Sequence, residues 1–249
     1  MLTKRFGTKV AVDGLDLHVP RGSMFGLVGP NGAGKTTTLS MATGLLRPDA
    51  GTATVLGHDV WQDPPRAKAL MGVLPDGMRL FDRLTGRELL TYVGRLRQVP
   101  AGDITSRSEE LLGALGLSAD ADKMVVDYSA GMTKKIGLAS ALIHGPRLVI
   151  LDEPFEAVDP VSGDTIRKIL RGFSAGGGTV IFSSHVMELV ESLCDRLAVI
   201  GDGRILAAGA LDEVRAGASL NDRFMQLVGV DETSGSGLTW LNESNSGTR

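Results

Sequence analysis

A glycine-rich segment near the start of the chain has the residues needed to bind phosphate. GPNGAGKTT at residues 29–37 matches the pattern Gly-x4-Gly-Lys-Ser/Thr, in which the backbone curls so that successive N–H groups point at phosphate oxygens. Lys35 supplies a mobile positive charge for the β- and γ-phosphates, and the hydroxyl of Thr36 can ligate Mg2+. A helix beginning here would direct its positive dipole end at the same anion. The segment therefore predicts a polyphosphate site.

Two adjacent carboxylates follow an apolar run much later in the chain. In RLVILDEPFEAVD, residues 147–159, four apolar residues lead into Asp152 and Glu153. Acids at the end of a buried strand are costly to bury without cationic partners, and the phosphate loop offers such partners. From a strand adjacent to that loop, Asp152 would reach Mg2+ through the metal's water shell. Glu153 would orient or deprotonate a water that attacks the γ-phosphate, although on its own it reads equally well as a solvated acid.

A histidine closes the next apolar run. TVIFSSH, residues 179–185, ends in His185. A lone histidine is more often packed or solvated than functional, but the end of this strand should share an edge with the phosphate loop, where ligands of α/β proteins bind. This position favours contact between His185 and the γ-phosphate. The other histidines, His18, His58 and His144, have no such context.

Alternating strand and helix patterns must position these groups. Apolar runs predict strands at 15–19, 24–29, 52–57, 71–75, 147–152, 179–184, 196–200 and 204–209, with helices at about 35–45, 162–173 and 186–193. Apolar strands that alternate with helices favour an α/β fold with a parallel sheet covered on both faces.

The middle and the end of the chain differ from this pattern. Residues 77–144 read mainly as helices, and RELLTYVGRLRQV places Leu89, Leu90, Val93 and Leu96 on one helical face. We therefore expect one domain over residues 1–230, with a helical subdomain at about 77–144 inserted into the α/β core. Residues 231–249 are rich in Ser, Gly, Asn and Thr, which is typical of a disordered tail.

Composition narrows the class of protein. Hydrophobic residues make up 43% and charged residues 22% of the 249 residues, as in ordinary globular proteins. The net charge of −3 gives no general basicity for nucleic acid, so no nucleic-acid partner is expected. Cys194 is the one cysteine, which excludes an intrachain disulfide and fits a reducing compartment. No apolar run approaches the ~20 residues of a membrane-spanning helix.

Six motifs in order resemble those of ATP-binding cassette (ABC) ATPases, the nucleotide-binding subunits of membrane transporters, over roughly residues 2–228. They are Phe6 as the aromatic that stacks on adenine, GPNGAGKTT as Walker A, LPD (74–76) at the glutamine-loop position, YSAGM (128–132) as the signature, LVILDEP (148–154) as Walker B, and SSH (183–185) with the switch histidine. EAVD (156–159) occupies the D-loop position.

The resemblance implies a fold and a set of site residues. The fold is a P-loop NTPase core with a mostly parallel sheet, an N-terminal antiparallel β-subdomain and an inserted α-helical subdomain. Its cofactors are ATP and Mg2+, with Glu153 and His185 catalytic and Thr36, Asp76 and Asp152 at the metal. The implied nucleotide contacts are Phe6, Gly29, Pro30, Asn31, Gly32, Ala33, Gly34, Lys35, Thr36, Thr37, Ser129, Gly131 and Asp159.

The signature implies partners. Ser129 is a good N-cap for a helix running to about Ile143, and Gly131 allows close approach of backbone to a phosphate. In the family this helix start faces ATP held by the other protomer. The resemblance thus implies a dimer with a second cassette, identical or homologous, and a separate integral membrane permease. The chain would lie in the cytoplasm on the inner face of the cell membrane. The segments RGSMFGLVGPNGAGKTTTL and YSAGMTKK are most similar in sequence to cassettes of bacterial drug exporters.

The sequence departs from the family pattern at several positions. Phe6 replaces tyrosine, Asp76 stands where glutamine is usual, and Ala130 and Met132 replace glycine and glutamine of the signature. EAVD lacks the usual Gly-Leu pair but retains its final aspartate. Lys35, Asp152, Glu153 and His185 are all kept, which favours ATP hydrolysis. Two alternatives stay open: a nucleotide-binding gating subunit that turns over slowly or not at all, and a soluble ABC ATPase.

Overall fold

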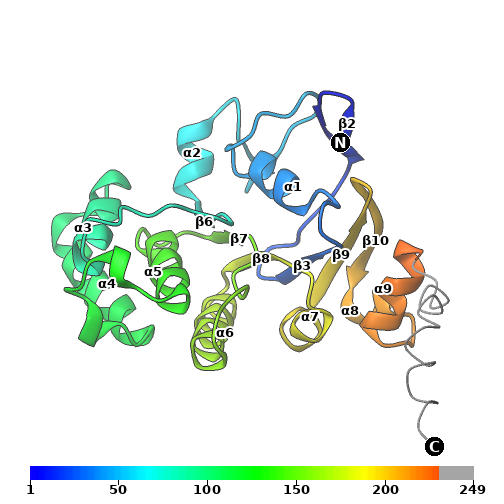
Figure 1. The fold of residues 1–249 in the computed structure, drawn as a ribbon. Helices are drawn as coiled ribbons and strands as arrows, with labels where there is room; N and C mark the ends of the chain where they lie inside the picture. The colour runs from blue at the N-terminus through cyan, green and yellow to red at the C-terminus, as the bar shows by residue number, and fades with distance from the viewer. Residues whose placement is uncertain (230–249) are drawn as a thin grey trace, which may run out of the picture.

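The computed structural model describes residues 1–229, and the predicted tail at 231–249 lies outside them. Within the described part, a six-stranded sheet with the order β10-β9-β3-β8-β7-β6 forms the centre of the molecule (Figure 1). Neighbouring strands run parallel except β10 and β9, so the predicted mostly parallel sheet is confirmed. The strands are β3 Met24–Val28, β6 Met71–Leu74, β7 Leu148–Leu151, β8 Thr179–Ser184, β9 Arg196–Gly201 and β10 Arg204–Ala210.

The strand order corrects one prediction. The strand that carries the two acids, β7, is not adjacent to β3, which leads into the phosphate loop; β8 lies between them and pairs with both. An interior parallel strand is apolar on both faces whichever neighbours it has, so the sequence pattern alone does not fix the order. The acids therefore approach the loop across the end of β8.

Successive side chains of the strands enter two separate cores. In β7, Val149 and Leu151 pack into one hydrophobic cluster, whereas Leu148 and Ile150 pack into the other. This alternation follows from the twofold repeat of a strand. Helix α1 (Lys35–Ala42) covers one face, and α6 (Pro160–Ala175) and α7 (Met187–Leu193) cover the opposite face (Figure 1).

The N-terminal region forms small antiparallel sheets. Strand β1 (Leu2–Phe6) pairs with β2 (Lys9–Leu15), and β4 (Thr54–Val55) pairs with β5 (His58–Asp59). The predicted strand at 15–19 is wrong, because β2 ends where that pattern begins. Leu17 and Val19 are only half-buried against the core and join no ladder, so their alternation reflects burial without strand pairing.

Helices fill most of the chain between β6 and β7. They are α3 (Gly86–Leu96), α4 (Ala101–Ala114) and α5 (Ala130–Leu142), with short 3-10 turns at Ser118–Asp120 and Val125–Asp127. On the predicted apolar face of α3, Leu89 and Leu90 are buried, whereas Leu96 is 62% exposed. Leu96 is the last residue of α3.

Three further helices complete the described chain. They are α2 (Pro64–Ala69), α8 (Leu211–Arg215) and α9 (Leu220–Val228). Within residues 1–229, every helix falls short of the length and hydrophobicity that a membrane crossing requires.

Candidate functional site

The phosphate loop connects β3 to α1, in the strand–loop–helix setting that the motif requires. Gly34 has a φ of +105°, and a Cβ there would lie 2.5 Å from the carbonyl oxygen of Ala11. A Cβ at Gly29 would lie 2.5 Å from the carbonyl oxygen of Ile200. These two positions therefore require glycine, because the loop is wedged against β2 and the end of β9.

Lys35, the first residue of α1, points back along the loop. Its side chain is only 6% exposed. Its ammonium group donates hydrogen bonds to the carbonyl oxygens of Gly29 at 2.7 Å and Pro30 at 3.4 Å. These contacts hold the positive charge inside the curl of the loop, where the motif predicts phosphate binding.

Ser183 connects the two acids at the end of β7. Asp152 is 3% exposed, and its Oδ1 accepts a hydrogen bond of 2.5 Å from the Ser183 hydroxyl. The Ser183 oxygen in turn accepts a hydrogen bond of 2.8 Å from the backbone N–H of Glu153. The sequence pattern did not predict this role of Ser183, whose only signal was its place directly after the apolar residues 180–182. Ser183 stabilises a buried carboxylate that would otherwise be costly.

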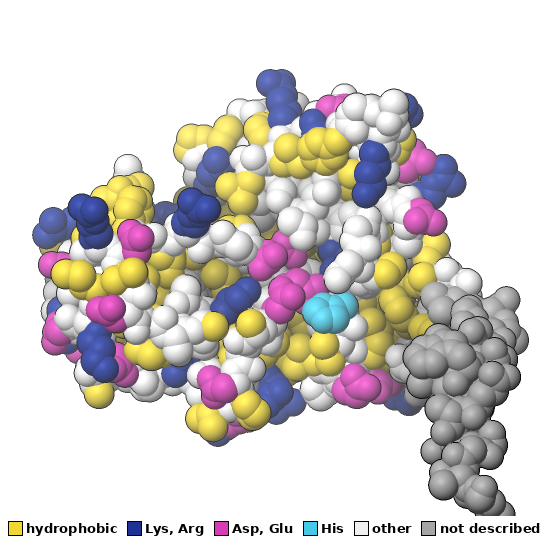
Figure 2. Space-filling view, in the orientation of Figure 1, with side chains coloured by type: hydrophobic (Ala, Val, Ile, Leu, Met, Phe, Trp, Pro, Cys, Tyr) yellow, Lys and Arg dark blue, Asp and Glu magenta, His cyan; other side chains and the backbone are white. Residues whose placement is uncertain are grey.

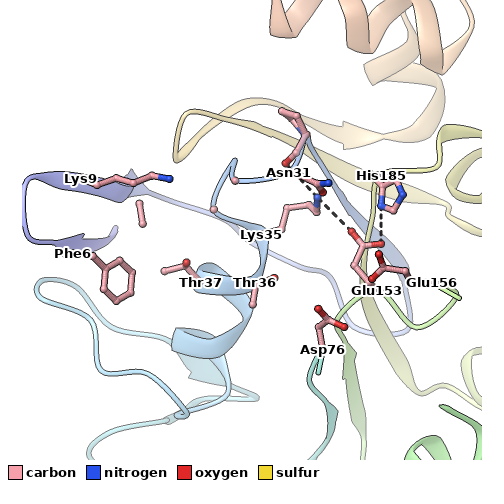
Figure 3. Close-up of a pocket in the computed structure, with 14 residues that line it drawn as sticks. Phe6, Lys9, Asn31, Lys35, Thr36, Thr37, Asp76, Glu153, Glu156 and His185 are labelled. Carbon is pink, nitrogen blue, oxygen red and sulfur yellow. Dashed lines mark hydrogen bonds and ion pairs between the residues drawn. The ribbon is translucent and has the colours of Figure 1, made fainter. Parts of the chain in front are cut away.

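Glu153 joins the phosphate loop to the histidine. One carboxylate oxygen lies 3.4 Å from Nζ of Lys35, and the other lies 3.2 Å from Nδ1 of His185 (Figure 3). The backbone of Glu153 has a φ of +45°, in the left-handed region that residues other than glycine adopt at a cost. Strain of this kind persists only where the surroundings impose it, and it clusters at functional sites.

These side chains open into one cleft of about 420 Å³. Acidic side chains and a histidine gather around a hollow in the middle of this face (Figure 2). The predicted residues that line the cleft are Phe6, Pro30, Asn31, Gly32, Gly34, Lys35, Thr36, Thr37, Asp76, Glu153 and His185. Lys9, Ala11 and Glu156 also line it and were not predicted.

Other predicted site residues lie outside the cleft lining. Gly29, Ala33 and Asp152 are buried. The signature residues Ser129 and Gly131 lie at the start of α5, and the D-loop residue Asp159 lies at the start of α6. Ser129 caps α5 as predicted, its hydroxyl accepting a hydrogen bond of 3.2 Å from the Met132 N–H. A Cβ at Gly131 would lie only 2.7 Å from Oδ2 of Asp159, the N-cap of α6. A side chain at position 131 would therefore require Asp159 or Ser162 to shift where α5 meets α6.

Asp159 is held as an anion at the start of α6. Its Oδ1 accepts hydrogen bonds from the backbone N–H groups of Val161 at 3.0 Å and Ser162 at 2.9 Å. Hydrogen bonds from Ser162 are the main cause of a pKa for Asp159 below its ordinary value. The carboxylate therefore complements the positive end of α6.

The oxygen ligands at the cleft suit Mg2+ together with a polyphosphate. Mg2+ in proteins usually takes one or two carboxylates and completes its shell with phosphate oxygens and water. Thr36 and Asp76 line the cleft, and the buried Asp152 directly precedes Glu153, which also lines it. Within residues 1–229, no group of three or more Asp, Glu, His or Cys residues could hold a metal unaided. The donor set fits a metal that is bound jointly with the phosphates.

Comparison with known proteins decides the family. The sequence profile of the ABC transporter family matches residues 12–156, which include the phosphate loop, the signature and both acids. The chain belongs to the ABC transporter family, as an ATP-binding cassette. ABC cassettes hydrolyse ATP to power transport.

Relatives of this cassette include subunits of drug-resistance systems. It is 38% identical to the linearmycin resistance ATP-binding protein LnrL of Bacillus subtilis, over 84% of this chain and 67% of that one. It is also 38% identical to the daunorubicin/doxorubicin resistance ATP-binding protein DrrA of Streptomyces peucetius, over 88% and 67% of the two chains. The resemblance to cassettes of bacterial drug exporters is thus confirmed.

Solved structures share the fold of this cassette. An ATP-binding subunit of an ABC transporter superposes with a TM-score of 0.85 at 27% identity, covering 91% of this chain and 96% of that one. A nucleotide-free ATP-binding cassette superposes with a TM-score of 0.78 at 24% identity, covering 93% and 97%. The predicted fold class is therefore confirmed.

Proposed function

We propose that this cassette hydrolyses Mg-ATP to power export through a separate membrane subunit. The observation that carries the proposal is the contact chain Lys35–Glu153–His185, which joins the phosphate loop to a carboxylate and a histidine within one cleft. The relatives, which include antibiotic resistance and Nod factor export ATP-binding proteins, support export as the direction.

The residues divide the work of phosphoryl transfer. Lys35 binds the β- and γ-phosphates and offsets the negative charge that shifts during transfer. Glu153 orients the attacking water and accepts its proton on a carboxylate oxygen. His185 contacts the carboxylate oxygen of Glu153 that faces away from Lys35, and it holds the γ-phosphate. Thr36, Asp152 and Asp76 would hold Mg2+, which would supply further positive charge to offset the charge of the phosphates.

Nucleotide contacts extend along the cleft from this centre. Phe6 is 51% exposed at the mouth, where its ring can stack on adenine. The backbone of residues 29–34 and the hydroxyls of Thr36 and Thr37 bind the phosphates. The signature residues Ser129 and Gly131, with Asp159, contact ATP held by a second cassette in a head-to-tail dimer.

A membrane subunit would engage the helical part of the chain. We propose that residues 77–144 form a subdomain within the 1–230 domain, and that a groove along 76–128 receives the permease. Exposed aromatic side chains support this assignment, because Phe81 is 55% and Tyr92 is 43% exposed, and their rings meet edge to face at 5.0 Å. The cassette would then act at the cytoplasmic face of the membrane.

Two measurements test this proposal. Purified full-length protein should release phosphate from Mg-ATP, and the chain expressed in its source cell should co-purify with a protein of several membrane spans. Phosphate release without such a partner would support a soluble ATPase instead. A bound partner without phosphate release by the complex would refute hydrolysis and leave a gating role.

A further inference from the structure

Lys134 of α5 places its ammonium group between two segments of the candidate site. Its Nζ donates a hydrogen bond of 2.9 Å to the backbone carbonyl of Glu153 and lies 3.6 Å from Oδ1 of Asp76. Its side chain is only 18% exposed, although lysine is among the residues least often buried. A shielded ammonium with two oxygen partners is fixed in position, and charge-assisted hydrogen bonds of this kind are stronger than neutral ones.

The backbone of Glu153 is thereby held from both sides. Its N–H donates to Ser183 of β8, and its carbonyl oxygen accepts from Lys134 of α5 and, at 3.2 Å, from the backbone N–H of Glu156. These bonds flank the residue whose φ is +45°. A left-handed conformation of a residue with a side chain needs such support from its surroundings. The Glu156 bond is local to the turn, whereas Lys134 supplies the part of the support that comes from the helical region of the chain.

Asp76 shares the same ammonium group. It follows β6, lines the nucleotide cleft, and its side chain is 45% exposed. The family usually places a neutral glutamine here, so this chain brings an additional negative charge close to Glu153. The nearby Lys134 offsets that charge without itself lining the cleft.

Resting on the proposed ATPase function, we propose that Lys134 is a positioning residue for Glu153 and couples it to the charge at Asp76. Lys134 fixes the main chain of Glu153, and therefore the point at which its carboxylate meets Lys35 and His185. If Asp76 contacted a different group, the strength of the hydrogen bond from Lys134 to Glu153 would change. Through Lys134, the helical part of the chain would therefore influence how Glu153 orients the attacking water.

Steady-state hydrolysis by the full chain tests the positioning role. Lys134→Met should lower kcat roughly tenfold to hundredfold, as expected when a catalytic group moves by about 1 Å, and should change KM for Mg-ATP by less than about threefold. Lys134→Arg keeps a charged donor and should restore most of the rate. The matched control is Lys168→Met, which removes an exposed lysine of α6 paired with Asp164 at 2.8 Å and should leave kcat unchanged.

Hydrogen exchange provides a readout that does not depend on turnover. Without nucleotide, amides of segment 152–159 should exchange about tenfold faster in Lys134→Met than in the wild type or Lys168→Met, because a charged hydrogen bond is lost. Lys134→Gln serves the same purpose if the methionine variant does not fold. Unchanged exchange with unchanged kcat would overturn the proposal, and so would a loss of rate that Lys134→Arg does not restore.

The coupling to Asp76 and the underlying function are tested separately. Asp76→Asn should change kcat less in the Lys134→Met background than alone, since the two residues share one contact. Equal effects in both backgrounds would overturn the coupling. If the wild-type chain and its membrane complex release no phosphate, the proposed function fails, while faster exchange in Lys134→Met would still support the positioning role.

Discussion

Glu153→Gln separates catalysis from nucleotide binding at this site. The substitution keeps the shape of the side chain and removes the charge that lies 3.4 Å from Lys35 and 3.2 Å from His185. A general base contributes about 10²–10⁴ to the rate of proton transfer, so kcat should fall by about that factor. Lys134 and Ser183 bind the main chain of Glu153 and remain in place, so the loop should keep its conformation.

Nucleotide binding should be preserved or strengthened in the same variant. Glu153 and a phosphate compete for Lys35, and two charges at about 4 Å interact with a gross energy of about 4 kcal/mol at an effective dielectric constant near 20. Most of this energy is offset by desolvation of the two groups. A remaining gain of about 1 kcal/mol would tighten ATP binding roughly fivefold.

Phosphate release and equilibrium titration with a fluorescent ATP analogue measure the two effects. Glu188→Gln is the matched control, because Glu188 is an exposed acid three positions beyond His185 and does not line the cleft. The assigned role of Glu153 would be refuted by unchanged kcat. A loss of affinity as large as the loss of kcat/KM would also refute it, since Glu153 would then act in binding.

Three further predictions follow from the structure. Lys35→Ala should weaken ATP binding at least about tenfold in the same titration, because the loop loses its only side-chain ammonium, and unchanged affinity would refute the phosphate site. Ser183→Ala leaves the buried Asp152 without its hydroxyl donor and should lower the free energy of unfolding in urea by about 1–3 kcal/mol, whereas an unchanged midpoint would show that another donor replaces it. Burial, reinforced by Arg97, lowers the pKa of His144 to about 4 from an ordinary 6.5. Between these values the unfolded chain binds more protons, so stability should fall as pH drops from about 6.5 to 4, and His144→Gln should flatten that fall in pH-dependent denaturation.

Features that depend on residues close together in the chain were predictable from the sequence, whereas contacts between distant segments were not. The phosphate loop and the N-cap at Ser129 were predicted correctly, because each depends on residues adjacent in the chain. The position of β8 between β3 and β7 was not predicted, because the sequence of an apolar strand does not indicate which strands pair with it. The contact of Lys134 with Glu153 was missed for the same reason, because it joins residues that are 19 positions apart.

Strand register explains why the acids, the serine and the histidine meet. Leu151 pairs with Phe182, so the next residues along, Asp152 and Ser183, lie side by side at the carboxyl edge of the sheet. On the other side of β8, Val28 pairs with Ser184, which brings the start of the phosphate loop alongside His185. A slip of one residue would turn each side chain to the opposite face. The apolar residues of β8 that enter both cores therefore fix the register on which the site depends, although none of them touches the cleft.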